Sequence, residues 1–497
     1  MTSGPVPPPR HPLSAHLKKL AAHSAVYGAA DVFTNVVNFL LFPLYTSYLG
    51  LIDYGHLALL ITFGTLAKIV FRLGLDAGFF RVHYDMETEE AQRRLAGTVA
   101  AFAAGVGLVL FLGVVAGAGP LTHAVLGEEA PARTWVVLVA ADVFVGTLTF
   151  VPASLLRIQD RPGLFSALAA LRHTVNTGLK VLLLVRGWGV AGILWSDLLA
   201  TTVFALSLLP VLVRHARPAF DRAALKEVLA FGLPKVPHGF LVQVLNVADR
   251  WILDLFVPRA AVGLYQTGYT FGAGVKFALS AFEPAWAPFV YAQARREGAP
   301  VTLGRVATWA FAAFVWVALA VGVLGRELLV LMTPNNPAFR AAAPVIPVVA
   351  LAYLFHGLFL LTSVGIGIEK RARYYPMVTA AAAAVNLVLN FTLIPRFGIM
   401  GAAWATVAAY AVMAVLGGVF SHRLYPIPFE WGRMGLVALA ALATAAAGGL
   451  APSALMPAFA VKGGLLALFG AALFATGLLR WPRGGIVEDT LIRGDQP

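Results

Sequence analysis

Cysteine is absent from the sequence, and charged residues make up only 12% of its 497 positions. The lack of cysteine excludes disulfides, thiolate metal sites and cysteine nucleophiles. Soluble domains carry about 25% charged residues, so the scarcity of charge excludes an ordinary water-soluble protein. The sequence also has no His-Glu-x-x-His motif and no complete phosphate-binding loop. We therefore expect a protein that is not an enzyme and that holds no cofactor or metal.

Hydrophobic residues are abundant instead, at 59% of the chain. The mean hydropathy is +0.79, which is typical of a protein with many transmembrane helices. Because one crossing needs about 20 apolar residues, the apolar stretches predict an all-α polytopic membrane protein with about fourteen spans. These spans lie near residues 22–48, 55–80, 95–118, 133–155, 164–185, 189–213, 226–257, 261–290, 304–325, 341–364, 374–394, 399–421, 432–450 and 457–480.

The formal net charge of +13 is distributed unevenly between the loops. If the N-terminus is cytoplasmic, the loops on that side hold 23 lysines and arginines and those on the other side hold 7. The seven on the other side are Arg133, Arg186, Arg259, Arg326, Arg340, Arg396 and Lys462. Such a bias marks the cytoplasmic side of membrane proteins. It predicts that both termini are cytoplasmic, and it explains the positive charge without nucleic-acid binding.

Two stretches six spans apart resemble one another. "FLLFPLYTSYLGLIDYGHLAL" ends the first span and "WILDLFVPRAAVGLYQTGYTF" ends the seventh, and each leads through a short turn to a Gly/Tyr pair. An even offset gives repeats of the same orientation, which predicts two pseudo-symmetric six-helix lobes plus two C-terminal helices. The expected division is a cytoplasmic segment 1–20, an N-lobe 21–217, a C-lobe 218–424, two extra spans 425–481 and a cytoplasmic tail 482–497.

Charged residues lie within spans one to eight, whereas spans nine to fourteen are nearly free of them. A charge inside the membrane costs about 2.5–3.5 kcal/mol on insertion scales and usually faces a protein interior or water. The cations are Lys68, Arg72, Arg172, Lys180, Lys235, Arg250 and Lys276, and the acids are Asp31, Asp76, Asp142, Asp197, Asp249, Asp254 and Glu283.

Helical spacing places these charges on shared polar faces. Span seven aligns Lys235, Gly239, Gln243, Asn246, Arg250 and Asp254, with Asp249 beside them; spans one and eight add Tyr27, Asp31 and Asn38, and Tyr269, Lys276 and Glu283. Aligned polar faces on several helices predict a shared hydrated cavity with cations at different depths.

Simpler structural roles stay open for parts of this pattern. Arg72–Asp76 and Arg250–Asp254 have the i,i+4 spacing of salt bridges on one helix. Pro234 and Pro237 would serve equally as packing kinks or as hinges beside a cavity.

The stretches "NFLLFPLYTSYLGLIDYG", "GLDAGFFRVHYD", "FGLPKVPHGFLVQVLNVADRWILDLF" and "VGLYQTGYTFG" with "SAFEPAWAPFVY" resemble the polysaccharide-repeat-unit flippases. These belong to the multidrug/oligosaccharidyl-lipid/polysaccharide exporter superfamily. The resemblance implies two six-helix lobes around a central cavity. It also implies that the chain moves an undecaprenyl-pyrophosphate-linked oligosaccharide across the cytoplasmic (inner) membrane by alternating access, in cell-surface polysaccharide biosynthesis.

The resemblance gives the polar residues expected roles. The translocation set is Lys68, Arg72, Arg172, Lys180, Lys235, Arg250, Lys276, Asn38, Gln243, Asn246, Tyr27 and Tyr269, and the candidates for coupling to H⁺ or Na⁺ are Asp31, Asp249 and Glu283. Asp249 is either the counter-ion of a pathway arginine or a proton carrier.

The implied partners are the lipid-linked anionic oligosaccharide, membrane lipids, and the glycosyltransferases and polymerase of the same pathway. The alternatives are a lipid II flippase, a multidrug or cation antiporter of the same superfamily, and, from a different class, a membrane-bound sugar transferase.

Overall fold

The computed structural model describes residues 37, 39–127, 132–294, 296 and 298–476, and within them every regular element is a helix. The all-α fold class is confirmed. The first half of the described chain contains α2 (Phe42–Tyr48), α3 (Leu51–Arg72), α4 (Leu75–Asp85), α5 (Glu89–Ala116), α6 (Ala118–Leu126), α7 (Ala132–Leu148), α8 (Phe150–Ile158), α9 (Pro162–Val185) and α10 (Gly189–His215). The second half contains α11 (Arg222–Gly232), η1 (Leu233–Lys235), α12 (Val236–Phe256), α13 (Arg259–Gly272), α14 (Val275–Gln293), α15 (Ala299–Met332), η2 (Pro337–Ala342), α16 (Val345–Thr362), α17 (Val364–Ile368), α18 (Tyr374–Leu424), α19 (Trp431–Gly449) and α20 (Leu455–Ala475).

Eleven helices of the described chain are long and apolar enough to cross a membrane. Three predicted spans are not counted separately among them. Most of span one lies outside the described residues, span eight is divided into α13 and α14 at residues 273–274, and spans eleven and twelve are joined in α18. The described helices therefore agree with predicted spans two to fourteen.

The joined helix α18 is a hairpin. Gly398 has φ 55° and ψ −132°, outside the helical region. Tyr375, near the start of α18, donates to the Ser363 carbonyl at 3.4 Å, and Ser421, near its end, accepts from the Gly365 amide at 2.9 Å. Because both ends of α18 contact the same segment, the helix must double back at Gly398.

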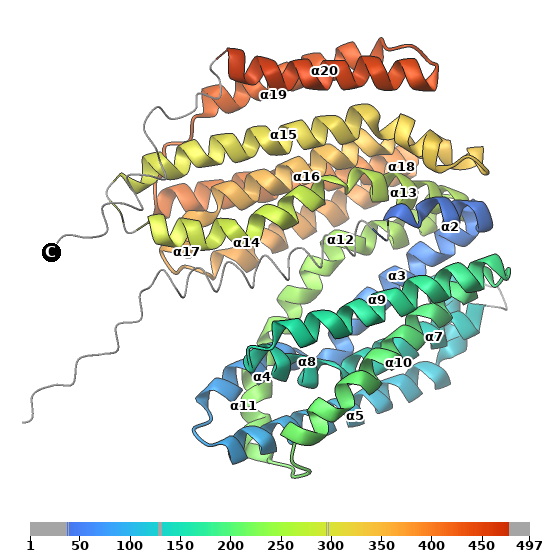
Figure 1. The fold of residues 1–497 in the computed structure, drawn as a ribbon, viewed down its shortest axis with the longest axis vertical. Helices are drawn as coiled ribbons and strands as arrows, with labels where there is room; N and C mark the ends of the chain where they lie inside the picture. Colours follow the sequence, from blue (N-terminus) through green and yellow to red (C-terminus); the bar gives the residue numbers. More distant parts are fainter. Residues whose placement is uncertain (1–36, 38, 128–131, 295, 297, 477–497) are drawn as a thin grey trace, which may run out of the picture.

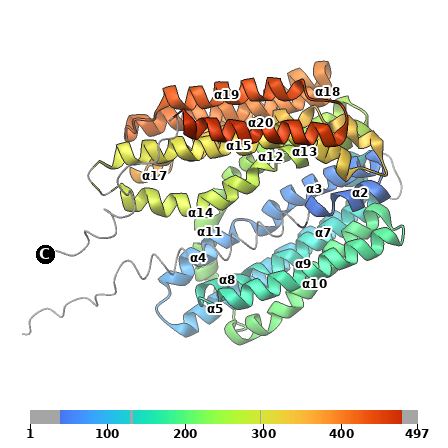
Figure 2. The same ribbon diagram turned by 45° about the horizontal axis from the view of Figure 1, so that its top comes forward.

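The helices form two layers, which we call the N-lobe (α3 to α10) and the C-lobe (α12 to α18). Figure 1 shows the N-lobe in blue to green below the C-lobe in green to orange, with α19 and α20 on the outer face of the C-lobe. The turns that carry the predicted cytoplasmic cations, including those between α4 and α5 and between α10 and α11, meet at one end of the bundle. We call this the basic end; the other end carries α2, η2 and the turn before α13 (Figure 2).

Spans two and seven are both broken. Span two changes direction at Leu73 and Gly74, whose φ values are 48° and 70°. Span seven changes at the 3₁₀ turn η1, which contains Pro234. The two breaks touch, because a Cβ built on Gly74 would lie 2.2 Å from the Gly232 carbonyl oxygen. This contact requires glycine.

The break in span seven lets it belong to both lobes. α11 falls within the expected C-lobe range 218–424, yet it packs against α4 and α5 of the N-lobe. α12 then continues into the C-lobe and packs along α18.

A second close crossing joins the lobes away from the basic end. A Cβ on Gly55 of α3 would lie 2.5 Å from the Arg259 carbonyl oxygen, and a Cβ on Gly263 of α13 would lie 2.1 Å from that of Leu51. Each glycine meets a carbonyl four residues before the other glycine. Two halves related by a pseudo-twofold axis make reciprocal contacts of this kind, so the crossing agrees with the predicted repeat.

One charge prediction was wrong in the C-terminal spans. Lys462 was assigned to a loop, and spans nine to fourteen were expected to be nearly free of charge. Lys462 instead lies inside α20 and binds Glu327 of α15 at 2.7 Å, with 9% and 3% of the two residues exposed. The pair attaches the last span to the C-lobe.

Candidate functional site

A central cavity of about 570 Å³ lies between the lobes. Five cations line it: Lys68 from α3, Arg172 and Lys180 from α9, Arg250 from α12 and Lys276 from α14. The first three belong to the N-lobe and the last two to the C-lobe. The cavity is therefore a positively charged space shared by both halves.

Two further cavities continue from this space toward the basic end. One of about 380 Å³ shares Lys68 and Arg172 with the central cavity and adds Arg72 and Lys235. The other has a volume of about 930 Å³. It shares Arg172 with the central cavity and Arg72 with the cavity of about 380 Å³, and it adds Arg157. All seven predicted cations thus line one set of adjoining cavities.

The N-lobe wall holds its cations through α9. Lys180 binds Asp197 of α10 at 2.8 Å, and Asn176, one turn earlier on α9, donates to the same carboxylate at 2.7 Å. Arg172 donates to the Thr201 hydroxyl at 3.0 Å, and Thr201 donates to Asp142 at 2.5 Å. Because residues four apart share a helix face, the α9 residues point together at these acids.

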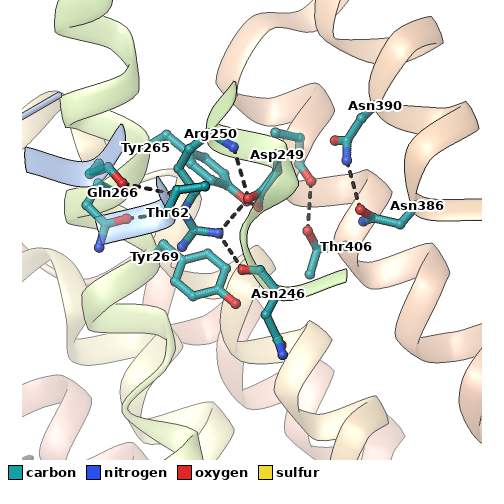
Figure 3. Close-up of polar contacts among 12 residues, drawn as sticks. Thr62, Asn246, Asp249, Arg250, Tyr265, Gln266, Tyr269, Asn386, Asn390 and Thr406 are labelled. Carbon is teal, nitrogen blue, oxygen red and sulfur yellow. Dashed lines mark hydrogen bonds and ion pairs between the residues drawn. The ribbon is translucent and has the colours of Figure 1, made fainter. Parts of the chain in front are cut away.

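The C-lobe wall is organised around Arg250, which is 4% exposed (Figure 3). Its guanidinium donates to Asp249 at 2.5 Å, to the Asn246 carbonyl at 2.8 Å and to Gln266 at 3.2 Å. It also lies 3.9 Å from the centroid of the Tyr269 ring, within the range of a cation–π contact. These contacts fix Arg250 at the cavity wall.

The i,i+4 pairing of Arg250 with Asp254, which the sequence left open, does not form. Arg250 pairs with its neighbour Asp249, and Asp254 pairs with Arg259 at 3.0 Å. The other i,i+4 pair is confirmed, because Arg72 binds Asp76 at 2.8 Å. Arg250 departs from the local rule because Asp249 is buried on the same side, where it also accepts a hydrogen bond from Tyr265.

Asp249 occupies the position of a counter-ion, with only 2% of its surface exposed. Figure 3 shows Asn386, Asn390 and Thr406 of α18 on the side of Asp249 away from Tyr269. Asn390 donates to Asn386 at 2.9 Å. The Asn386 Nδ2 and Asn390 Oδ1 atoms are buried and have no hydrogen-bond partner among the described residues.

The remaining predicted residues have varied positions. Gln243 and Tyr269 line the cavities, whereas Asn246 accepts a hydrogen bond from Tyr410 at 3.0 Å. Glu283 is exposed on α14, and no ion pair joins it to another described residue. Tyr27, Asp31 and Asn38 lie outside the described residues.

Six residues of the site were missing from the predicted set: Asp142, Asn176, Asp197 and Thr201 on the N-lobe wall, and Tyr265 and Gln266 on the C-lobe wall. Asp142 and Asp197 were recognised as intramembrane acids, but their place beside the α9 cations depends on the packing of α7 and α10 on α9. Thr201 carries no charge and resembles any other threonine in an apolar helix. The local signal for Asp142 and Asp197 was their charge within an apolar span, and Thr201 had no such signal.

The charges of the central cavity do not cancel. Five cations line it, against Asp142 and Asp197 on its wall and Asp249 behind Arg250. Five positive and three negative charges leave an excess of two positive charges. Such a space binds an anion more favourably than a cation.

Comparison with known proteins relates this chain to a family involved in polysaccharide biosynthesis. A family model described as polysaccharide biosynthesis protein matches residues 48–331. A probable low-salt glycan biosynthesis flippase, Agl15, of Haloferax volcanii is 22% identical over 319 residues, which are 62% of this chain and 65% of the relative. The chain thus spans less than two thirds of the length of the curated relatives it matches.

Solved structures share the fold at low sequence identity. The lipid II flippase MurJ, in an inward closed conformation, aligns with a TM-score of 0.74 at 13% identity, covering 91% of this chain and 99% of MurJ. An inward-facing multidrug resistance transporter of the MATE family aligns with a TM-score of 0.62 at 15% identity, covering 81% and 95%. The two-lobed architecture is therefore one that membrane transporters use.

Proposed function

The chain belongs to the polysaccharide biosynthesis protein family, and from this premise we propose that it is a flippase for a lipid-linked anionic oligosaccharide. The cargo is an undecaprenyl-pyrophosphate-linked oligosaccharide, carried from the cytoplasmic to the outer leaflet by alternating access. The observation that carries the proposal is the central cavity, in which cations from both lobes face one space.

The chemistry of the cavity suits a diphosphate. Arginine and lysine bind phosphate oxygens through charge-assisted hydrogen bonds, which strengthen away from bulk water. A diphosphate that joins a lipid to a sugar carries one negative charge on each phosphate, which matches the excess of two positive charges. The lipid tail stays in the bilayer while the head group enters between the lobes.

The adjoining cavities suggest the order of contacts. Lys235 and Arg72, nearest the basic end, first meet the head group, together with Lys68. Arg172 and Lys276 then hold it in the central cavity, and Lys180 and Arg250 are the last contacts before release. Tyr269 offers an aromatic face on the same wall.

We assign the basic end to the cytoplasm of the inner membrane, with both termini on that side. The assignment rests on the excess of lysine and arginine in the loops that meet there. It makes the adjoining cavities an entrance from the side on which lipid-linked precursors are assembled, where the glycosyltransferases and the polymerase are the expected partners.

For coupling to H⁺ or Na⁺, the geometry favours Asp249 over Glu283, and Asp31 stays a candidate from the sequence. Asp249 is buried in contact with the cavity arginine, whereas Glu283 is exposed on α14. An ion bound to Asp249 competes with Arg250 for the carboxylate. Ion binding and release would then change how tightly Arg250 is held and how strongly it attracts the head group.

Flipping of a labelled lipid-linked oligosaccharide in proteoliposomes tests the proposal. We expect Lys276→Gln and Arg250→Gln to slow flipping by about ten- to a hundredfold, because a hydrogen bond to a charged group contributes about 1.5–3 kcal/mol. Arg305→Gln, an exposed arginine on α15, is the matched control and should retain the rate. Undiminished flipping by well-folded Lys276→Gln and Arg250→Gln proteins would show that the cavity cations do not bind the cargo.

Parallel assays separate the alternative functions. Faster flipping of lipid II would assign the chain to lipid II transport. Efflux of an organic cation would indicate an antiporter, which the positive cavity disfavours. Turnover of a donor sugar would indicate a transferase.

A further inference from the structure

Arg259 joins the two lobes at the end of the bundle away from the basic end. The sequence placed this arginine in an outer loop, but it is the first residue of α13 and its side chain is only 20% exposed. Its Nε and Nη2 atoms donate to the two oxygens of Asp254 at 3.0 and 3.1 Å. Its Nη1 atom lies 3.0 Å from Nε2 of His56, which accepts the bond because arginine can only donate.

The two contacts of Arg259 differ in what they connect. Asp254 precedes Arg259 by five residues in the C-lobe, so this pair moves as one piece. His56 lies 203 residues away on α3 of the N-lobe and is 2% exposed. Any separation of the lobes at this end must break the bond to His56 and can leave the bond to Asp254 intact.

The surroundings show that the lobes are closed at this point. The guanidinium also lies beside Gly127 of the N-lobe, where a Cβ would be 3.2 Å from its Nη2 atom. The His56 ring contacts the ring of Trp135 on α7, with centroids 5.6 Å apart. Arg259 thus reaches a pocket made by three segments of the N-lobe.

Backbone and aromatic contacts continue the closure toward α2. The crossing of Gly55 and Gly263 brings α3 and α13 into backbone contact directly beside Arg259. Phe42, Tyr54 and Phe339 form an edge-to-face cluster between α2, α3 and η2, with centroids 5.7 to 6.3 Å apart. These backbone and aromatic contacts close the end of the bundle that lies opposite the basic end, whereas the cavities extend toward the basic end.

We propose that Arg259 is a latch that holds the outer end closed by binding His56, and that Asp254 keeps the arginine aimed at it. This inference rests on the proposed alternating access, in which the outer end must open to release the cargo. Opening exchanges the Arg259–His56 bond for water, and closing restores it. The latch therefore sets the balance between the two states without touching the cargo.

The absence of cysteine from the chain makes a direct test possible. Spin labels are attached to cysteines that replace two exposed residues, Trp188 between α9 and α10 in the N-lobe and Phe397 beside Gly398 of α18 in the C-lobe. Double electron–electron resonance spectroscopy then measures the distance between the two spin labels in the full chain in lipid nanodiscs. The fraction of molecules with the longer distance reports outer opening.

Removing the acceptor should open the latch. We expect His56→Leu and Arg259→Gln to raise the ratio of open to closed molecules about tenfold, as the loss of one bond to a charged group would. His56→Gln should stay near the original ratio, because its side-chain oxygen can accept from Arg259. Arg326→Gln, which alters an exposed arginine on α15, is the control and should leave the ratio unchanged.

The outcomes separate the latch from the proposed function. Unchanged distances in folded His56→Leu and Arg259→Gln proteins would overturn the latch. An equal opening by His56→Gln and His56→Leu would also overturn it, because that result points to packing of the histidine ring. Flipping by the unaltered chain is measured separately, so its failure would count against the cargo and leave the distance result intact.

Discussion

Thr201 sits between a cation and an acid on the N-lobe wall of the cavity. Its hydroxyl accepts from Arg172 at 3.0 Å and donates to Asp142 at 2.5 Å, and the residue is 1% exposed. A single hydroxyl thus fixes the guanidinium and links it to a counter-charge. The residue lines the cavity of about 380 Å³ beside Arg172, and we expect it to position that arginine for the proposed head group.

Replacing this hydroxyl should weaken cargo binding more than it slows transport of bound cargo. For Thr201→Val we expect the half-saturating concentration of lipid-linked oligosaccharide to rise about three- to tenfold, less than the loss of a cavity cation would cause, because Arg172 keeps its charge and loses only one of its positioning bonds. The measurement is the dependence of the flipping rate on cargo concentration, and Thr201→Ser should restore the original value.

The adjacent threonine provides the control for this prediction. Thr202 donates only to the Leu198 carbonyl of its own helix among the described residues, so Thr202→Val should leave the half-saturating concentration unchanged. Equal effects at the two positions would mean that Thr201 does not position Arg172.

At this scale the sequence was a good guide to which residues matter and a poor guide to what they bind. All seven intramembrane cations line the cavities. A charge inside the membrane is energetically costly, and it usually faces a protein interior or a water-filled cavity. Asp254 pairs with Arg259 and Lys462 pairs with Glu327, and the i,i+4 spacing along a helix indicated neither ion pair. The i,i+4 rule describes one isolated helix, whereas Glu327 reaches Lys462 over 135 residues through tertiary packing.

Among the helices, the breaks in spans two and seven are the main departure from straight membrane crossings. Gly74 ends the turn between α3 and α4 in the left-handed region, against the backbone of Gly232 at the break in span seven. A left-handed conformation costs about 1–2 kcal/mol for residues other than glycine. The space for a Cβ is also missing, since the nearest oxygen lies 2.2 Å away.

Gly74→Ala should therefore destabilise the protein by about 2 kcal/mol or more. Thermal unfolding in detergent would report this as a lower midpoint. Gly105→Ala is the matched control, because Gly105 lies within α5 and a Cβ there has no atom within 4 Å. Alanine is the better helix former, so this variant should be as stable or slightly more stable. Similar midpoints for the two variants would contradict the close crossing.

Breaks were harder to predict than spans. Pro234 and Pro237 indicated the break in span seven, but span two breaks without a proline, and Pro284 and Pro288 lie within a continuous α14. A proline removes one backbone hydrogen bond, and neighbouring helices decide whether the helix then bends. Such decisions depend on packing that the local sequence does not contain.

For the whole molecule, the charged space opens in one direction. The cavities adjoin one another toward the basic end, and the lobes touch at Gly55 and Gly263 at the other. The two-lobe arrangement was predictable from the repeat and the span count. The sequence did not predict which end of the bundle is closed, because that depends on the relative orientation of the two lobes.

A cysteine placed in the cavity should report this direction. In the unloaded protein, Thr65→Cys, on the central cavity wall, should react with a membrane-impermeant thiol reagent from the cytoplasmic side and about tenfold more slowly from the outside. Trp188→Cys, exposed in a turn at the other end, should show the opposite preference. Equal reaction of Thr65→Cys from both sides would contradict a closed outer end.

Span seven has a consequence for how the chain is built. During synthesis the N-lobe emerges first and folds first, but it lacks α11, which covers α4 and α5. The first segment of the second half therefore completes the first half as soon as it leaves the ribosome. Docking of α11 then fixes the point from which α12 continues toward the C-lobe, so the N-lobe holds the first part of span seven in place while the rest of the second half folds.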